Sequence, residues 1–282
     1  MCDKTKDLGR TTFGIAIMFG IYWMYSYFLE EYIPIADSLK SLLGLVVLYV
    51  IGLGMFVLIT KKVSVQKYEK KKISLRTIGL SFLLQFTAIM VLSVMVNIST
   101  VLGADNTSAD INATSLYMLF MLLIFNPIIE EIVFRKILAD KLLKYGEGFY
   151  MLVSSFCFGI VHGVSLGVPH IIYTFILGMI WSYLMVKTGN IKLVIFMHAL
   201  SNFFGSVIIQ SLLNISMIVT GIYSMLLMLS GVIGLIMFIV NKKKVVIDGE
   251  SFFIKKGTMK EIFSNKGIWF YMALTLIVMI IK

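Results

Sequence analysis

The run ISMIVTGIYSMLLMLSGVIGLIMFIV, from Ile215 to Val240, contains no charged residue. An α-helix rises 1.5 Å per residue, so about 20 apolar residues in a helix span the hydrocarbon core of a bilayer. This run is long enough to do so, and we predict that it forms a transmembrane helix.

Apolar runs of similar kind occur along most of the chain, near residues 12–29, 41–60, 77–101, 116–135, 149–168, 170–187 and 192–213. The chain is 59% hydrophobic and 14% charged, with a mean hydropathy of +0.94. A soluble domain of 282 residues could not bury this much apolar surface in one core. The sequence therefore predicts an all-α, polytopic transmembrane bundle of about eight spans, surrounded by membrane lipid. A shorter ninth run, Ile268–Ile281, either spans the bilayer or lies at its surface.

Lysine and arginine are confined almost entirely to alternate loops. If the N-terminus is cytoplasmic and every long run crosses the bilayer, all but Lys40 and Lys282 of the 25 basic residues face the cytoplasm. Cytoplasmic loops of membrane proteins carry this excess, so we predict a cytoplasmic N-terminus. The net charge of +10 then reflects contact with an anionic inner leaflet and not binding of nucleic acid. The lysine- and isoleucine-rich composition favours a bacterial plasma membrane, in which the protein is multi-pass.

Acidic residues are almost absent from the apolar runs. Of the 15, only Glu130 and Glu131 lie well inside one, in FNPIIEEIVFR from Phe125 to Arg135. An ionisable side chain is costly in lipid and is a functional candidate by default. Glu131 stands four residues before Arg135, the favoured order for an ion pair along a helix, so we assign this pair mainly a structural role. Glu130 points about 100° away around the helix and needs a partner from another helix.

The histidines are the candidate partners. Glu130 and His162 are equally distant in sequence from Gly146, where the chain is expected to turn, so both should lie at the same depth. His198 stands one helical turn before Asn202, and these two side chains share a face. Because His198 is near the cytoplasmic start of its run, we expect the cluster in the cytoplasmic half of the membrane. His170, which follows Pro169, is expected to mark a helix boundary at an outer turn.

Pro127 lies one turn before Glu130 and has no N–H to donate to the carbonyl of Leu123. The helix should therefore bend or open there, next to the polar side chain of Asn126. Open backbone at membrane depth is tolerated only where it faces protein or water. A water-filled pocket would suit a hydrolytic site, and an ordinary proline kink is the alternative interpretation.

Three motifs follow one another on successive predicted spans: Glu130-Glu131-x-x-x-Arg135, Phe158-x-x-x-His162 and His198-x-x-x-Asn202. Together they resemble the CPBP family of intramembrane proteases, which includes the Rce1-type CAAX prenyl endopeptidases and the bacterial Abi proteins. The resemblance extends from about Leu116 to Gly205. It divides the chain into three N-terminal spans (1–115), a four-span catalytic core (116–213), and a C-terminal part (214–282) with one span, a basic cytosolic tail and the short terminal helix.

The resemblance implies a role for each motif residue. Glu130 and His162 would activate a water molecule, His198 and Asn202 would stabilise the oxyanion, and Glu131, Arg135 and Phe158 would support the site. Two side-chain donors one turn apart can converge on one developing oxyanion. Zinc bound by Glu130, His162 and His198 is the alternative, since two histidines and a carboxylate form a known catalytic zinc set. The sequence lacks a His-Glu-x-x-His helix, and Asn202 is a poor zinc ligand, so we favour a glutamate mechanism without a cofactor.

The resemblance implies an intramembrane endopeptidase that cuts a peptide or membrane protein near the cytosolic membrane face. Prenylated proteins, signalling peptides and bacteriocin precursors are the substrate candidates, and the sequence does not choose among them or define an oligomeric state. A bacteriocin immunity or binding protein on the same scaffold is a competing interpretation. A transporter is a third, because intramembrane glutamate and histidine also relay protons, but no repeated halves are evident.

Overall fold

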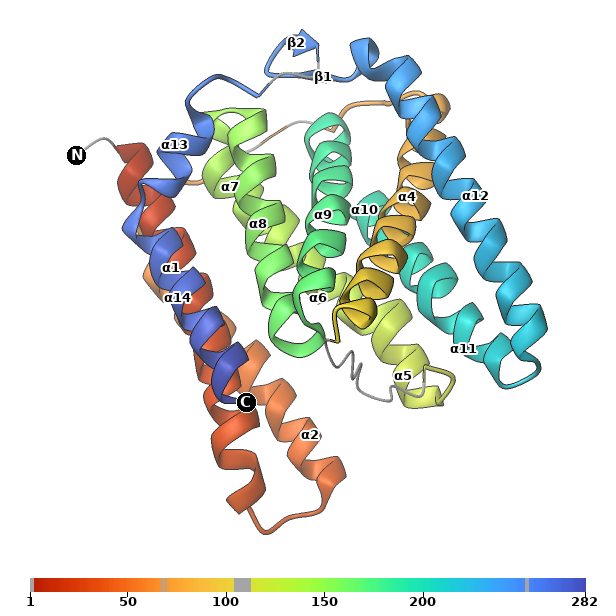
Figure 1. The fold of residues 1–282 in the computed structure, drawn as a ribbon. Helices are drawn as coiled ribbons and strands as arrows, with labels where there is room; N and C mark the ends of the chain where they lie inside the picture. Colours follow the sequence, from red (N-terminus) through yellow and green to blue (C-terminus); the bar gives the residue numbers. More distant parts are fainter. Residues whose placement is uncertain (1–2, 67, 69, 104–112, 252–253) are drawn as a thin grey trace.

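The computed structural model describes residues 3–66, 68, 70–103, 113–251 and 254–282. Within these residues, eight helices are long and apolar enough to cross a membrane, as the sequence predicts. These spans are Asp3–Tyr32, Asp37–Thr60, Leu75–Val101, Leu116–Tyr145, Glu147–Leu166, Val168–Thr188, Ile191–Leu213 and Met217–Lys244. The predicted polytopic helix bundle is therefore confirmed (Figure 1).

Four of the spans contain π-helical segments in series with α-helical ones. The first consists of α1 (Asp3–Met24), η1 (Tyr25–Leu29) and η2 (Glu30–Tyr32), and the second of α2 (Asp37–Val46), η3 (Val47–Gly52) and α3 (Leu53–Thr60). The fourth consists of α5 (Leu116–Phe120), η4 (Met121–Phe125), α6 (Asn126–Glu131), η5 (Ile132–Ile137), α7 (Leu138–Leu142) and η6 (Leu143–Tyr145). The seventh consists of α10 (Ile191–Asn202), η7 (Phe203–Val207) and α11 (Ile208–Leu213).

The remaining spans are α4 (Leu75–Val101), α8 (Glu147–Leu166), α9 (Val168–Thr188) and α12 (Met217–Asn241), the last continued by η8 (Lys242–Lys244). A two-residue antiparallel ladder follows, made of β1 (Val246–Ile247) and β2 (Glu250–Ser251). The chain ends with α13 (Thr258–Phe263) and α14 (Lys266–Ile281). The last helix is 16 residues long and runs beside α1 and α8 (Figure 1).

Glycine allows the chain to reverse sharply on both sides of α8. Gly146 (φ +122°) and Gly167 (φ +83°) each form a one-residue break between two spans. These φ values are readily accessible only to glycine. The predicted turn at Gly146 is confirmed, and it places the Leu116–Tyr145 span and α8 side by side.

The loops predicted to be cytoplasmic meet at one end of the bundle, at the top of Figure 1. Lys144 Nζ lies 2.7 Å from Asp7 Oδ2, which ties α1 to the turn before α8. The Asp248 carboxylate accepts the backbone N–H groups of Glu147 (2.6 Å) and Gly148 (3.1 Å), so the C-terminal tail caps α8. We call this the basic end and define it by residues 3–11, 61–76, 135–148, 187–192 and 242–266. The membrane side that it faces remains a prediction.

The most buried helix is α8, which packs closely against α9. Gly178 makes this approach possible, because a Cβ atom there would lie 2.8 Å from Ser155 Cα. Further contacts join α4 to α9 and α12, and α1 to α3 and α14. The exposed face of α12 is apolar, with Ile233 and Ile236 each more than half exposed, as expected of a surface that contacts lipid.

Candidate functional site

The fourth span widens where it carries the glutamates. The N–H of Asn126 bonds the carbonyl of Met121 in a π-helical turn, and Pro127 has no N–H to offer. The carbonyl of Leu122 instead accepts a hydrogen bond from Nδ2 of Asn202, at 2.8 Å. The opening predicted at Pro127 is therefore present, and a side chain from another span occupies it.

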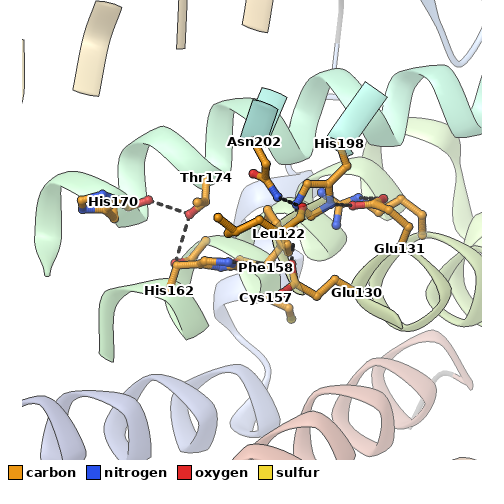
Figure 2. Close-up of polar contacts among 12 residues, drawn as sticks. Leu122, Glu130, Glu131, Cys157, Phe158, His162, His170, Thr174, His198 and Asn202 are labelled. Carbon is orange, nitrogen blue, oxygen red and sulfur yellow. Dashed lines mark hydrogen bonds and ion pairs between the residues drawn. The ribbon is translucent and has the colours of Figure 1, made fainter. Parts of the chain in front are cut away.

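Glu130 lies between two histidines from two other helices (Figure 2). Its Oε2 atom is 3.8 Å from Nε2 of His162 on α8 and 3.9 Å from Nε2 of His198 on α10. The same oxygen is buried and has no hydrogen-bond partner among the described residues. The structure thus brings together Glu130 and the two histidines that the sequence singled out, and Glu130 and His162 lie level as predicted.

The hydrogen bond of His162 determines its tautomer. Its Nδ1 lies 2.7 Å from the carbonyl oxygen of Phe158, which can only accept, so Nδ1 carries the hydrogen. In the neutral ring, Nε2 is then an acceptor that faces Glu130. The ring also packs against Phe158, with centroids 4.5 Å apart. Phe158 therefore supports the orientation of His162 through both its backbone and its side chain.

His198 is fixed by Glu131 and by an aromatic ring. Its Nδ1 lies 2.8 Å from Glu131 Oε1, and its ring stacks on Trp181 with centroids 4.3 Å apart at 22°. The predicted ion pair is also present, with Arg135 Nε 3.1 Å from Glu131 Oε2 and both side chains fully buried. Arg135 lies over the Phe158 ring at 4.1 Å. Glu131 therefore does more than the predicted pairing along its own helix, because it also holds a histidine of the site.

Asn202 lies one turn beyond His198 on the same side of α10, as expected (Figure 2). One of its amide hydrogens is used by Leu122. The amide group carries a second hydrogen, which can serve another acceptor. Asn202 and His198 both line the larger of the two cavities beside Glu130.

Two cavities meet at the site. Cavity 1, of about 470 Å³, extends between the first hairpin and the fourth span, and cavity 2, of about 830 Å³, extends between α4, α9 and the seventh span. The residues that line both are Asn126, Glu130, His162 and Ser165. The cluster is therefore adjacent to enough space for water and a polypeptide segment.

The cavities beside the cluster extend away from the basic end, and the predicted position of the cluster in the cytoplasmic half of the membrane stays a prediction. His162 lies one turn before α8 ends at Leu166, at the end opposite Gly146. The cavities extend in the same direction, since Glu30 and Lys40 line cavity 1 and Asn214 lines cavity 2. The predicted depth depended on His198, which is near the basic end of its own span, and on Glu130, which lies in the inner half of its apolar run. His170 lies in the first turn of α9, the helix boundary that the sequence predicted, and lines cavity 2.

The zinc alternative depends on Glu130, His162 and His198 acting as ligands. In the part of the chain that the structure describes, no group of three histidine, cysteine, aspartate or glutamate side chains is arranged to hold a metal ion. Nδ1 of both histidines is engaged, and Nε2 of each ring faces Glu130, which is how a metal-binding histidine is commonly held. Independence from a metal therefore stays a prediction, and we derive no step through a metal.

Three further residues around the cluster, Trp181, Gln85 and Ser165, were not predicted from the sequence. Trp181 packs on His198, and its Nε1 donates to Gln85 Oε1 at 3.2 Å. Gln85 was detectable as an amide inside an apolar run. Trp181 gave no such signal, because an aromatic residue in a transmembrane helix usually only fills space. Ser165, one turn after His162, was equally inconspicuous.

Comparisons with known proteins include a match to the segment of the chain that carries Glu130, His162 and His198. Residues 112–204 match the family model described as type II CAAX prenyl endopeptidase Rce1-like. The protein described as "Putative membrane peptidase YdiL" of Bacillus subtilis (strain 168) is 33% identical over 104 residues, which is 36% of this chain. This match covers 41% of that relative's length. No solved structure matches the chain.

The matched residues include all four polar side chains proposed for chemistry: Glu130, His162, His198 and Asn202. The comparisons therefore confirm the resemblance that the motifs predict: over residues 112–204 this membrane protein is similar to the Rce1-like endopeptidase family.

Proposed function

We propose that this protein is an intramembrane endopeptidase in which Glu130, assisted by His162, activates a water molecule. The observation that carries the proposal is the placement of a buried, unpartnered glutamate oxygen 3.8 and 3.9 Å from two histidine nitrogens, beside two cavities. The Rce1-like match and the peptidase relative support the reaction class.

The spacing suits a water molecule held between the side chains. A separation of 3.8 Å is too long for a direct hydrogen bond, but a water can lie within hydrogen-bonding distance of both atoms. Glu130 Oε2 and His162 Nε2 are both acceptors, and a water has two hydrogens to give them. Its oxygen lone pair is then free to attack a peptide carbonyl. A general base of this kind typically contributes about 10²–10⁴-fold to the rate.

The remaining steps use side chains already in place. The water oxygen bonds to the carbonyl carbon while Glu130 takes one of its protons. The carbonyl oxygen becomes an oxyanion, which accepts a hydrogen bond from the second amide hydrogen of Asn202 and, when both nitrogens of the His198 ring carry a hydrogen, a second one from Nε2 of His198. Collapse of the intermediate breaks the C–N bond, and the proton held by Glu130 passes to the leaving amine. The products are a carboxyl terminus and an amino terminus.

The test is cleavage by wild type and by Glu130→Gln. New amino termini are profiled in membranes of cells that express each protein, and a peptide found in this way is then assayed with purified protein. Gln keeps the shape of the side chain but cannot take the proton, so turnover should fall by about 10²–10⁴-fold or more. Glu261→Gln, an exposed position at the basic end, is the matched control and should cleave normally.

The same comparison separates the competing functions. An immunity or binding protein would give the same set of amino termini in wild type, Glu130→Gln and cells without the protein. If correctly folded Glu130→Gln retains near-normal turnover, the glutamate mechanism is wrong. If wild type produces no new amino terminus and Glu130→Gln retains full protective activity in cells, the binding function replaces the protease.

A further inference from the structure

We infer that the site is entered from the extracytoplasmic side, and that its substrate is an extended polypeptide segment lying across Glu130 with one part in each cavity. The side of entry rests on the cavities and the charge distribution, and the nature of the substrate rests on the proposed function. The inference replaces the cytosolic access that the sequence alone suggested.

Cavity 1 leads from Glu130 to the end of the bundle opposite the basic end. Its inner part is lined by Val133 and Phe134, and its outer part by Ser26, Glu30 and Lys40 at the turn between the first two spans. The first hairpin thus forms one wall of the cavity, and the fourth span forms the other. Glu30 and Lys40 lie at the turn of the hairpin where water is available.

Cavity 2 leads in the same direction along the other side of the fourth span. Its lining includes His198 and Asn202 near the cluster, and Gln210 and Asn214 near the turn between α11 and α12. Ser165 lines both cavities and is itself exposed. The two cavities therefore flank the point where Glu130 and His162 face each other, as an endopeptidase that binds residues on both sides of the cut bond requires.

The path from Glu130 to the basic end is filled. Between Glu130 and the basic end, the fully buried Glu131–Arg135 pair is followed along the fourth span by Leu138, Ala139 and Leu142, none of them exposed to solvent. Lys141 is also buried, and its Nζ donates to the carbonyl of Thr60 at 3.0 Å. Among the described residues that line either cavity, none belongs to a basic-end segment.

The distribution of lysine and arginine assigns a membrane side to each end of the helix bundle. All lysines and arginines except Lys40 and Lys282 lie in the basic-end segments. Basic loops face the cytoplasm, so the open end faces the outside of the cell. A substrate that reaches Glu130 by either cavity must therefore be a polypeptide exposed at the outer membrane surface or in the outer half of the bilayer.

The test uses single cysteines in a background of Cys2→Ser and Cys157→Ala. Ser165→Cys reports on the cavities, and Ser264→Cys, exposed in the basic tail, is the matched control. Intact cells are treated with a membrane-impermeant maleimide, before or after permeabilisation. Ser165→Cys should react in intact cells, and Ser264→Cys only after permeabilisation.

Three results overturn the side of entry: reaction of Ser165→Cys only after permeabilisation, no reaction under either condition, or reaction of Ser264→Cys in intact cells. The substrate is tested separately, with cleavage measured before and after labelling. A bulky maleimide at position 165 should block cleavage, whereas full cleavage after complete labelling would contradict passage through the cavities. If Ser165→Cys reacts from outside but the wild-type protein cleaves nothing, the proposed function fails and the accessible cavity stands.

Discussion

Nδ1 of His198 lies 2.8 Å from Oε1 of Glu131, although the two residues belong to different spans. The other oxygen of the same carboxylate lies 3.1 Å from Nε of Arg135. Glu131 therefore fixes which way the His198 ring faces, and its contact with Arg135 holds the carboxylate in place. With Nδ1 held, Nε2 is directed toward Glu130, at 3.9 Å. Glu131 is a positioning residue as well as a structural one.

The first prediction separates these two roles of Glu131. Glu131→Arg and Arg135→Glu should each destabilise the protein by about 3–5 kcal/mol, because each leaves a buried charge without its partner. The double variant restores the ion pair in reversed order and should recover part of the expression and thermal stability. It should stay inactive, since position 131 no longer offers an acceptor to His198. Recovery of cleavage together with stability would show that Glu131 has no positioning role.

The second prediction concerns Asn202. Asn202→Ala removes one proposed oxyanion donor and should lower kcat by about 10²–10³-fold with a smaller effect on KM. It also leaves the carbonyl of Leu122 without its partner, which should cost about 1–3 kcal/mol of stability. Asn97→Ala is the control, because the Asn97 side chain also donates to a backbone carbonyl, but within its own helix, and it is exposed and lines neither cavity. Equal kcat values in the two variants would remove Asn202 from the mechanism.

The third prediction is that cleavage does not depend on a metal ion. Prolonged treatment of purified, active protein with a strong chelator, followed by metal analysis, should leave turnover unchanged. The expectation follows from Asn202, which is a poor zinc ligand, from the lack of a His-Glu-x-x-His motif in the sequence, and from the absence, among described residues, of a three-ligand cluster. Zinc bound in stoichiometric amount, lost together with activity and restored with it on re-addition, would establish the metal mechanism instead.

The fourth prediction concerns the C-terminal tail. Asp248 accepts two N–H groups at the start of α8, and its own φ of +54° is a value that asparagine tolerates well. Asp248→Ala should lower stability by about 1–2 kcal/mol through loss of the cap, with some backbone strain added. Asp248→Asn keeps an acceptor and the backbone preference, and should lose much less. Thermal unfolding of the purified variants measures this, and equal melting temperatures would show that the tail does not support α8.

Much of this architecture follows from single-residue patterns in the sequence. The eight spans are predictable because apolar length is a direct physical requirement of the bilayer. The meeting of Glu130 with His162 is predictable because Gly146 fixes the turn, and equal spacing from a turn gives equal depth along two adjacent helices. The Glu131–Arg135 pair follows from its spacing within one helix.

Other features depend on packing between spans, which no local pattern encodes. Trp181 contacts His198 because α9 lies against α10, and the spacing of α9 residues does not reveal that neighbour. The direction in which the cavities extend depends on packing for a similar reason. The depth of single residues along their own helices does not tell which side of a bundle is filled with side chains and which is open.

One wall of cavity 1 comes from the first hairpin, which lies outside the Rce1-like segment at residues 112–204. The proposed reacting groups and this wall of the cavity are thus separate stretches of sequence, which can change independently. Relatives can keep Glu130 and the histidines while exchanging residues such as Tyr22 or Tyr49, and so change which peptides they cut without rebuilding the chemistry. Transplanting residues 3–60 between two such relatives should then transfer cleavage preference, with the hairpin acting as an interchangeable recognition element.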